Sequence, residues 1–284
     1  MIREFSKLNT LGVMNITPNS FSDGKKFQNA ETLTQALEKN LSRANLIFDF
    51  GFESTAPMNQ AISAEEERAR FDEFFKQIES IDLSGQWISF DTYRPANFLY
   101  FSKRFKERYS DLHFIFNDVS GVIDEELKTL LKNKKSDPEF HYIYAFTHIP
   151  SRDLVLDHMK YLVEGDAVQQ AKTKFLMAMK VFQELGVGDK IILDPCFGFS
   201  KSYEQNWDLL KRFDELVRLI PADVSWLVGV SKKSFMRKAL PDSTDPFADA
   251  EKLHIKIIKE ITEKKLGHIL FRVHDFDIVE RANA

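Results

Sequence analysis

The amino-acid sequence predicts an α/β protein folded as a (β/α)₈ TIM barrel, with a single domain over residues 1–284. Eight short apolar segments alternate with longer charged segments of helical period from one end of the chain to the other. Within the short segments the apolar residues are continuous, which is typical of parallel strands covered by helices. A doubly wound sheet is the competing architecture, but it does not require eight units of nearly equal length. No linker rich in Pro, Gly or Ser divides the chain.

The expected strands are short runs rich in Ile, Phe, Val and Tyr, the residue types that favour extended backbone. They span residues 10–14, 46–50, 87–90, 113–116, 142–146, 190–193, 225–230 and 269–273.

The expected helices carry Leu, Ile or Phe at helical spacing on a charged background. They span residues 30–44, 64–81, 95–108, 124–134, 166–185, 203–219 and 249–265. Ser63 and Glu66 have the spacing of a capping box, and Pro95 suits the first position of a helix. Each apolar segment is therefore followed by a candidate helix.

Composition and charge exclude several classes of protein. The chain has 39 basic and 43 acidic residues, with no long run of either sign, so neither a nucleic acid nor an anionic membrane is an expected partner. The single cysteine, Cys196, excludes an internal disulfide and a cysteine zinc site, which fits a cytoplasmic protein. No signal-like segment and no apolar run of about 18 residues predicts secretion or a membrane span.

Polar residues at the expected strand ends suggest a binding site, because a barrel of this class builds its site there. Contact with water is enough to explain a polar residue at any one strand end. It does not explain why the whole ring of strand ends has this composition. Asp91, Asn117 and Asp194 are short acceptors that suit a planar heterocycle with amidine-like N–H donors. Lys233, Arg272 and His274 follow the last two strands, where this fold commonly binds phosphate, and a helix is expected to start after Ser231. We expect one side of the site to bind a heterocycle and the other an anion.

Seven ordered motifs resemble those of the dihydropteroate synthase family over residues 11–280. The motifs are LGVMNITPNSFSDG (11–24), DFGFESTAP (49–57), SFDTYRP (89–95), FNDVSG (116–121), LDPCFGFSK (193–201), GVSKKSF (229–235) and FRVHD (271–275). The resemblance implies a cytoplasmic homodimeric transferase of folate biosynthesis that binds Mg²⁺. The family condenses 6-hydroxymethyl-7,8-dihydropterin pyrophosphate with 4-aminobenzoate, releasing pyrophosphate and giving 7,8-dihydropteroate.

The resemblance also assigns a role to each site residue, with Lys233, Arg272 and His274 as the catalytic group. Asp91, Asn117, Asp194, Lys233 and Arg272 would bind the pterin. Asn15, Arg272 and His274 would hold pyrophosphate, and Asn15 would also reach Mg²⁺. Thr55, Pro57, Phe199 and Ser234 would shape the aminobenzoate pocket, which Phe21 would help to close. The amine of 4-aminobenzoate is nucleophilic when neutral, so no catalytic base is assigned.

The second loop departs from the family pattern, which leaves other functions open. Ala56 stands where the family has an arginine. The first loop also has Lys25 and Lys26 where a second glycine is usual, and Lys25 either replaces the lost charge or is simply solvated. The alternative is a pterin-binding protein with weak or no synthase activity. A folate methyltransferase is disfavoured because the anion-binding residues would have no role in it. His148 and Cys196 are interpreted as packing residues.

Overall fold

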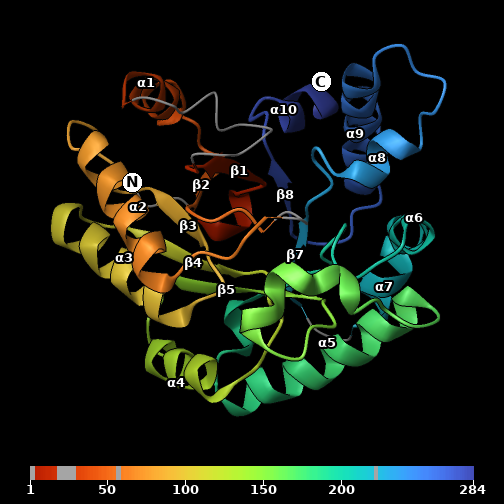
Figure 1. Cartoon of the computed structure of the whole chain (residues 1–284), viewed down its shortest axis with the longest axis horizontal. Helices are drawn as coiled ribbons and strands as arrows, with labels where there is room; N and C mark the ends of the chain where they lie inside the picture. The colour runs from red at the N-terminus through yellow and green to blue at the C-terminus, as the bar shows by residue number, and fades with distance from the viewer. Residues whose placement is uncertain (1–3, 18–29, 56–58, 221–222) are drawn as a thin grey trace.

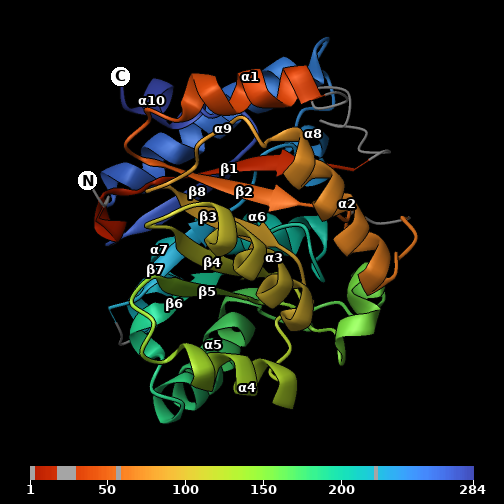
Figure 2. The same ribbon diagram turned by 90° about the vertical axis from the view of Figure 1, so that its left-hand side faces the viewer.

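Eight parallel strands close into a barrel in the computed structural model, which describes residues 4–17, 30–55, 59–220 and 223–284. The strands pair in sequence order, and β8 pairs with β1 to complete the ring. Figure 1 shows the strands at the centre with helices around them, and Figure 2 shows α2 and α3 along one side. The predicted TIM barrel is therefore confirmed.

The strands follow the predicted segments closely, but several extend into the polar residues. They are β1 (Thr10–Asn15), β2 (Leu46–Gly51), β3 (Trp87–Asp91), β4 (His113–Asp118), β5 (Phe140–Ala145), β6 (Ile191–Asp194), β7 (Ser225–Val228) and β8 (Ile269–Val273). Residues predicted to follow the strands, such as Asn15 and Asp91, therefore belong to their last paired positions. β5 begins two residues earlier than predicted, and β7 ends two residues earlier.

The helices confirm most of the predicted segments. They are α1 (Ala30–Asn40), α2 (Ala64–Gln77), α3 (Pro95–Arg108), α4 (Glu125–Lys134), α5 (Ala167–Glu184), α6 (Tyr203–Lys211), α7 (Phe213–Leu219), α8 (Ser234–Lys238), α9 (Pro246–Glu263) and α10 (Ile278–Asn283), with short 3₁₀ helices η1 (Phe5–Lys7), η2 (Arg152–Lys160) and η3 (Gly188–Lys190). The prediction of one helix over 203–219 is wrong, because the helix breaks at Arg212. The break accompanies the packing of Phe213 edge-on against Trp226, with ring centroids 5.6 Å apart.

Only half of the predicted capping box forms. The hydroxyl of Ser63 accepts a bond from the backbone N–H of Glu66, but the Glu66 carboxylate pairs with Arg70 at 2.5 Å. A complete capping box starts α6, where Ser202 and Gln205 bond to each other's backbone N–H groups. The spacing of Ser63 and Glu66 therefore predicted the start of the helix correctly, but it did not predict the partner of the Glu66 side chain.

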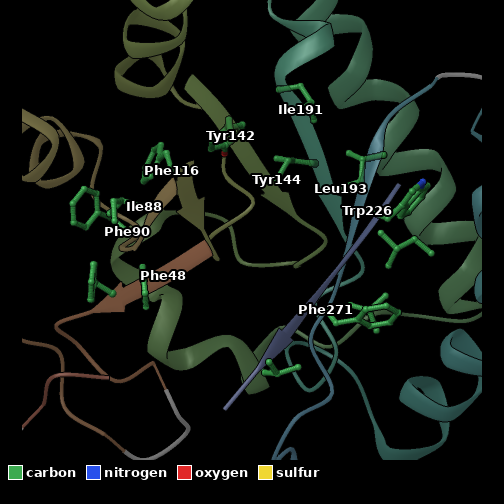
Figure 3. Packing of buried hydrophobic residues seen from close by; sticks show 14 of the residues in the cluster. Phe48, Ile88, Phe90, Phe116, Tyr142, Tyr144, Ile191, Leu193, Trp226 and Phe271 are labelled. Atoms are coloured by element: carbon green, nitrogen blue, oxygen red, sulfur yellow. The ribbon is translucent and has the colours of Figure 1, made fainter. Parts of the chain in front are cut away.

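The two largest parts of the core lie between the strands and the helices and inside the barrel. Phenylalanine rings dominate the outer part, and Figure 3 shows several of them, including Phe48, Phe90 and Phe116, on neighbouring strands. The inner part is a smaller layer that includes Leu11 and Ile47. Because the inner layer fills the barrel below its C-terminal edge, ligand-binding groups can gather only above it. No helix in the described ranges is long and apolar enough to cross a membrane.

Candidate active site

The strand register places three of the polar positions and one glycine side by side at the C-terminal edge of the barrel. Asn15 on β1 is paired with Gly51 on β2, Gly51 with Asp91 on β3, and Asp91 with Asn117 on β4. A side chain at Gly51 would meet the Asn15 Oδ1 atom at 3.1 Å and the Asp91 Cβ atom at 3.5 Å. Glycine therefore leaves room for Asn15 and Asp91 to approach each other.

Asp49 lies one layer deeper in the barrel, and sequence reasoning assigned it no role in the site. Its side chain is fully buried, and its carboxylate accepts bonds from Ser89 Oγ at 2.6 Å and from Asn117 Nδ2 at 3.2 Å. The bond from Asn117 leaves the amide Oδ1 atom of that residue as an acceptor for a ligand. The only signal in the sequence was a carboxylate inside the apolar run LIFDF, which a barrel interior tolerates only with partners.

Arg272 reaches across the barrel from β8 to the carboxylates of β2 and β3. Its Nε atom donates to Asp49 Oδ2 at 2.7 Å, and its Nη2 atom donates to Asp91 Oδ2 at 2.5 Å. These bonds place Arg272 beside the residues predicted to bind the heterocycle, as well as near those predicted to bind an anion. Asp49 and Asp91 fix the guanidinium in one orientation before any ligand binds.

Burial and neighbouring charges shift the pKa values of the charged groups in the site. Burial raises the pKa of Asp91 to about 6, an effect that the Arg272 guanidinium opposes and the charge of Asp49 reinforces. Burial also raises the pKa of Asp194, while the cations of Lys233, Lys201 and Arg272 oppose that rise. Burial lowers the pKa of Lys233, against the attraction of Asp194 and Asp91. The charge of each of these groups shifts the pKa of its neighbours, so they form one electrostatic cluster. Its members come from β2, β3, β6, β8 and the loop after β7.

The loop after β6 carries Phe199 and faces Lys233. The Lys233 Nζ atom lies 4.6 Å from the centroid of the Phe199 ring. Gly198 adopts a φ of +85°, which favours glycine, and a side chain there would also displace Lys233, whose Cδ atom would lie at 3.1 Å. The structure thus brings together Phe199 and Lys233, which were assigned to different substrates.

Lys201 holds this loop in place and was not singled out from the sequence. It is 2% exposed, and its Nζ atom donates to the carbonyls of Phe146, Cys196 and Phe199 at 2.9–3.1 Å. Burial lowers the pKa of Lys201 to about 8. Its position at the end of the motif LDPCFGFSK was the signal that could have identified it.

His274 is joined to the loop after β7 through Ser231. The Ser231 Oγ atom lies 3.0 Å from His274 Nδ1 and accepts a bond from the backbone N–H of His274 at 3.3 Å. The helix expected after Ser231 begins three residues later as the short α8, whose first residue, Ser234, is exposed. Lys233 precedes it as the N-cap, without a side-chain capping bond.

Of the remaining residues named from the first two loops, the structure describes only Thr55. Thr55 is half-buried at the end of the described part of the second loop. Phe21, Pro57, Ala56, Lys25 and Lys26 lie outside the described residues.

The two predicted packing residues show no catalytic arrangement with described side chains. Cys196 is buried at a φ of +54°, and burial raises the pKa of its thiol to about 12. His148 is half-buried and packs edge-on against Phe146. Burial lowers the pKa of His148.

The residues present fit a magnesium ion only if substrate and water supply most of its ligands. The described residues contain no group of three or more His, Cys, Asp or Glu side chains that could hold a metal. Asn15 offers an amide oxygen at the edge of the barrel, beside the space that Gly51 leaves. Mg²⁺ accepts such sparse coordination because it retains water and binds phosphate oxygens.

Comparison with known proteins agrees with this arrangement. The model of the family described as "Pterin binding enzyme" matches residues 11–274. The chain is 28% identical to a folate synthesis bifunctional protein of Arabidopsis thaliana over 82% of its own length, and it spans about half (48%) of that relative. It is 30% identical to a dihydropteroate synthase of Synechocystis, covering 83% of this chain and 75% of that protein. The solved Yersinia pestis dihydropteroate synthase, in complex with a sulfonamide drug, has the same fold, with a TM-score of 0.76, 23% identity and coverage of 98% and 92% of the two chains.

Proposed function

This chain belongs to the pterin binding enzyme family, and from that premise we propose that it is a dihydropteroate synthase. The reaction joins 6-hydroxymethyl-7,8-dihydropterin pyrophosphate to 4-aminobenzoate and releases pyrophosphate. One observation carries the proposal: Arg272 bonds to Asp91 of β3 and to Asp49, which also accepts a bond from Asn117 of β4, and the charges of Lys233 and Arg272 act on Asp194 of β6 at the same end of the barrel. This combination suits a ligand that joins a ring rich in N–H donors to an anion.

The acceptors would bind the pterin ring. Asp91 and Asp194 would accept its N–H bonds, and Asn117 would offer the amide oxygen that its bond to Asp49 leaves available. Lys233 would donate to the ring carbonyl and to the N5 side of the pterin. Because these side chains are held by the barrel before the ligand arrives, little ordering would be required on binding.

Charge balance explains how the site would treat pyrophosphate. Three carboxylates and three cations are described here, so they nearly cancel: Asp49, Asp91, Asp194, Lys201, Lys233 and Arg272. An incoming pyrophosphate therefore needs positive charge beyond this balanced set, which a bound Mg²⁺ would supply. Arg272 and His274 would hold its oxygens as negative charge builds on them, while Asp91 and Asp194 stabilise the cationic pterin methylene.

We also propose that Asn15 would help hold Mg²⁺, which supplies positive charge beside the pyrophosphate when bound. Thr55, Phe199 and Ser234 would shape the pocket for 4-aminobenzoate, together with Pro57 and Phe21. The neutral aromatic amine needs no base to attack, so the protein would act by orienting the amine and by excluding water. A homodimer and a cytoplasmic location remain predictions, and light scattering of the purified protein tests the first.

Turnover of both substrates by the purified protein tests the proposal. We expect Mg²⁺-dependent release of pyrophosphate in equal amount to the dihydropteroate formed. If calorimetry shows binding of the pterin pyrophosphate but no turnover occurs, the chain is instead a pterin-binding protein without synthase activity. The replacement of the family's arginine by Ala56 suggests that alternative. Binding of neither substrate would refute both readings.

A further inference from the structure

A buried network of charged residues lies beside the candidate site, between the end of β2, α2 and the start of α3. The Arg94 Nη1 atom donates to Glu53 Oε2 at 2.5 Å and to Glu67 Oε2 at 2.8 Å. Glu53 is 6% exposed and Glu67 is fully buried. Asn97 adds a bond from Nδ2 to Glu67 Oε2 at 2.6 Å. The single guanidinium therefore joins three segments of the chain.

The network also joins Glu53, two residues before Thr55, to Ile62. Glu53 Oε1 accepts a bond from the backbone N–H of Ile62 at 3.0 Å, and Arg94 Nη2 donates to the Ile62 carbonyl at 2.6 Å. Tyr93 completes the arrangement, because its hydroxyl donates to Glu53 at 3.2 Å and accepts from Arg94 Nη2 at 2.6 Å. Both backbone polar groups of Ile62 are therefore bound to the same charged pair.

This network fixes the relative positions of its groups more than it stabilises the folded protein. Removing two carboxylates and a guanidinium from water is costly, and a buried ion pair often contributes no more than apolar residues of the same volume. Burial raises the pKa of Glu67, which is a sign of that cost. A planar guanidinium with several donors fixes the relative positions of its acceptors, which a point charge does not.

We propose that Arg94 is a positioning residue for the second substrate: by holding Glu53, it fixes the backbone two residues before Thr55, which is proposed to shape the aminobenzoate pocket. This inference rests on the proposed function. Arg94 would act through Glu53 and would not touch either substrate.

Asn117 and Asp194 lie on β4 and β6, away from this network. Asp91 lies only three residues before Arg94, but it is held by the pairing of β3 and by its bond from Arg272. The pterin-binding acceptors therefore have supports outside the network.

Steady-state kinetics of Arg94→Met and Arg94→Lys test the inference. We expect Arg94→Met to raise KM for 4-aminobenzoate at least tenfold, while the Kd of the pterin pyrophosphate changes less than twofold. Arg94→Lys should recover part of the loss, because an ammonium still pairs with Glu53 but cannot hold Ile62 and Tyr93 at once.

Arg108→Met is the matched control, at the opposite end of α3. Arg108 donates to the Phe75 carbonyl at 2.5 Å and lies over the Phe75 ring at 3.4 Å, so its loss should lower stability without changing either substrate constant. An unchanged KM for 4-aminobenzoate in Arg94→Met would overturn the inference. Equal losses for both substrates would also overturn it, because they indicate general disruption.

Hydrogen exchange separates failure of this inference from failure of the proposed function. If the wild-type protein shows no turnover, the proposed function fails, and the amide of Ile62 then decides the inference. We expect that amide to exchange at least tenfold faster in Arg94→Met, with the Phe90 amide on β3 unchanged. Equal exchange at Ile62 in variant and wild type would overturn the role of Arg94.

Discussion

Replacing Asp49 tests whether the barrel interior organises the site from below. Asp49→Ala removes the acceptor of three donors, the Ser89 hydroxyl, the Asn117 amide and the Arg272 guanidinium. Breaking a buried charge pair costs about 3–5 kcal/mol, and each neutral bond contributes about 1 kcal/mol. Because Arg272 keeps its bond to Asp91, we expect a total loss of about 4 kcal/mol in the free energy of unfolding.

Urea denaturation followed by circular dichroism measures this loss as a fall in the midpoint at constant slope. Ser89→Ala is the matched control and should cost only about 1 kcal/mol, since it removes one neutral donor. A loss below 1 kcal/mol for Asp49→Ala would refute the reasoning, as would equal losses for both variants. Asp49→Asn provides a second test that keeps the side-chain volume. It should lower the pKa of Asp91, because the negative charge that raises it is removed.

Three further predictions concern the ligand, acid and thiol chemistry of the chain. Asp194→Ala should weaken binding of the pterin pyrophosphate by about 2–4 kcal/mol, because ring N–H donors lose a charged acceptor, and unchanged calorimetric affinity would contradict its assignment. Burial lowers the pKa of His141 to about 3, so the unfolded chain binds its proton first as pH falls below about 6.5. His141 should then contribute a fall in stability of about 1 kcal/mol per pH unit between pH 6 and 4. His141→Phe should reduce the measured slope by that amount, while His158 and His254, whose pKa burial lowers to about 4, keep their contributions; an identical slope in the variant would exclude a contribution from His141. The Cys196 thiol, whose pKa burial raises to about 12, should react with a disulfide reagent only after unfolding, and rapid reaction of the native protein would show that it is accessible.

Much of the fold follows from local patterns. Continuous apolar runs predicted all eight strands because parallel strands in a barrel are covered on both faces. Helical spacing and cap residues predicted α3 to the residue, because Pro95 fixes its start locally. The pattern did not predict the break at Arg212, where the following residue, Phe213, packs on Trp226 of β7.

The candidate site, like the fold, could be predicted only in part from the sequence. Residue type and position at strand ends were enough to select Asp91, Asn117, Asp194 and Lys233 as candidates, since the ends of parallel strands meet at one edge. The same reasoning could not identify Arg94, because the acceptors of its guanidinium lie on three separate segments.

The sequence by itself determined the barrel, its strand order and the polar character of its C-terminal edge, because these depend on periodicity and on the chemistry of each residue. Only the tertiary structure decided the partners of the buried charges. Asp49 is one carboxylate within an apolar run, and Arg272 lies 223 positions later, yet barrel closure brings them to 2.7 Å. The physical reason is that a charge buried inside the barrel requires a partner, and strand register determines which distant residue can supply it.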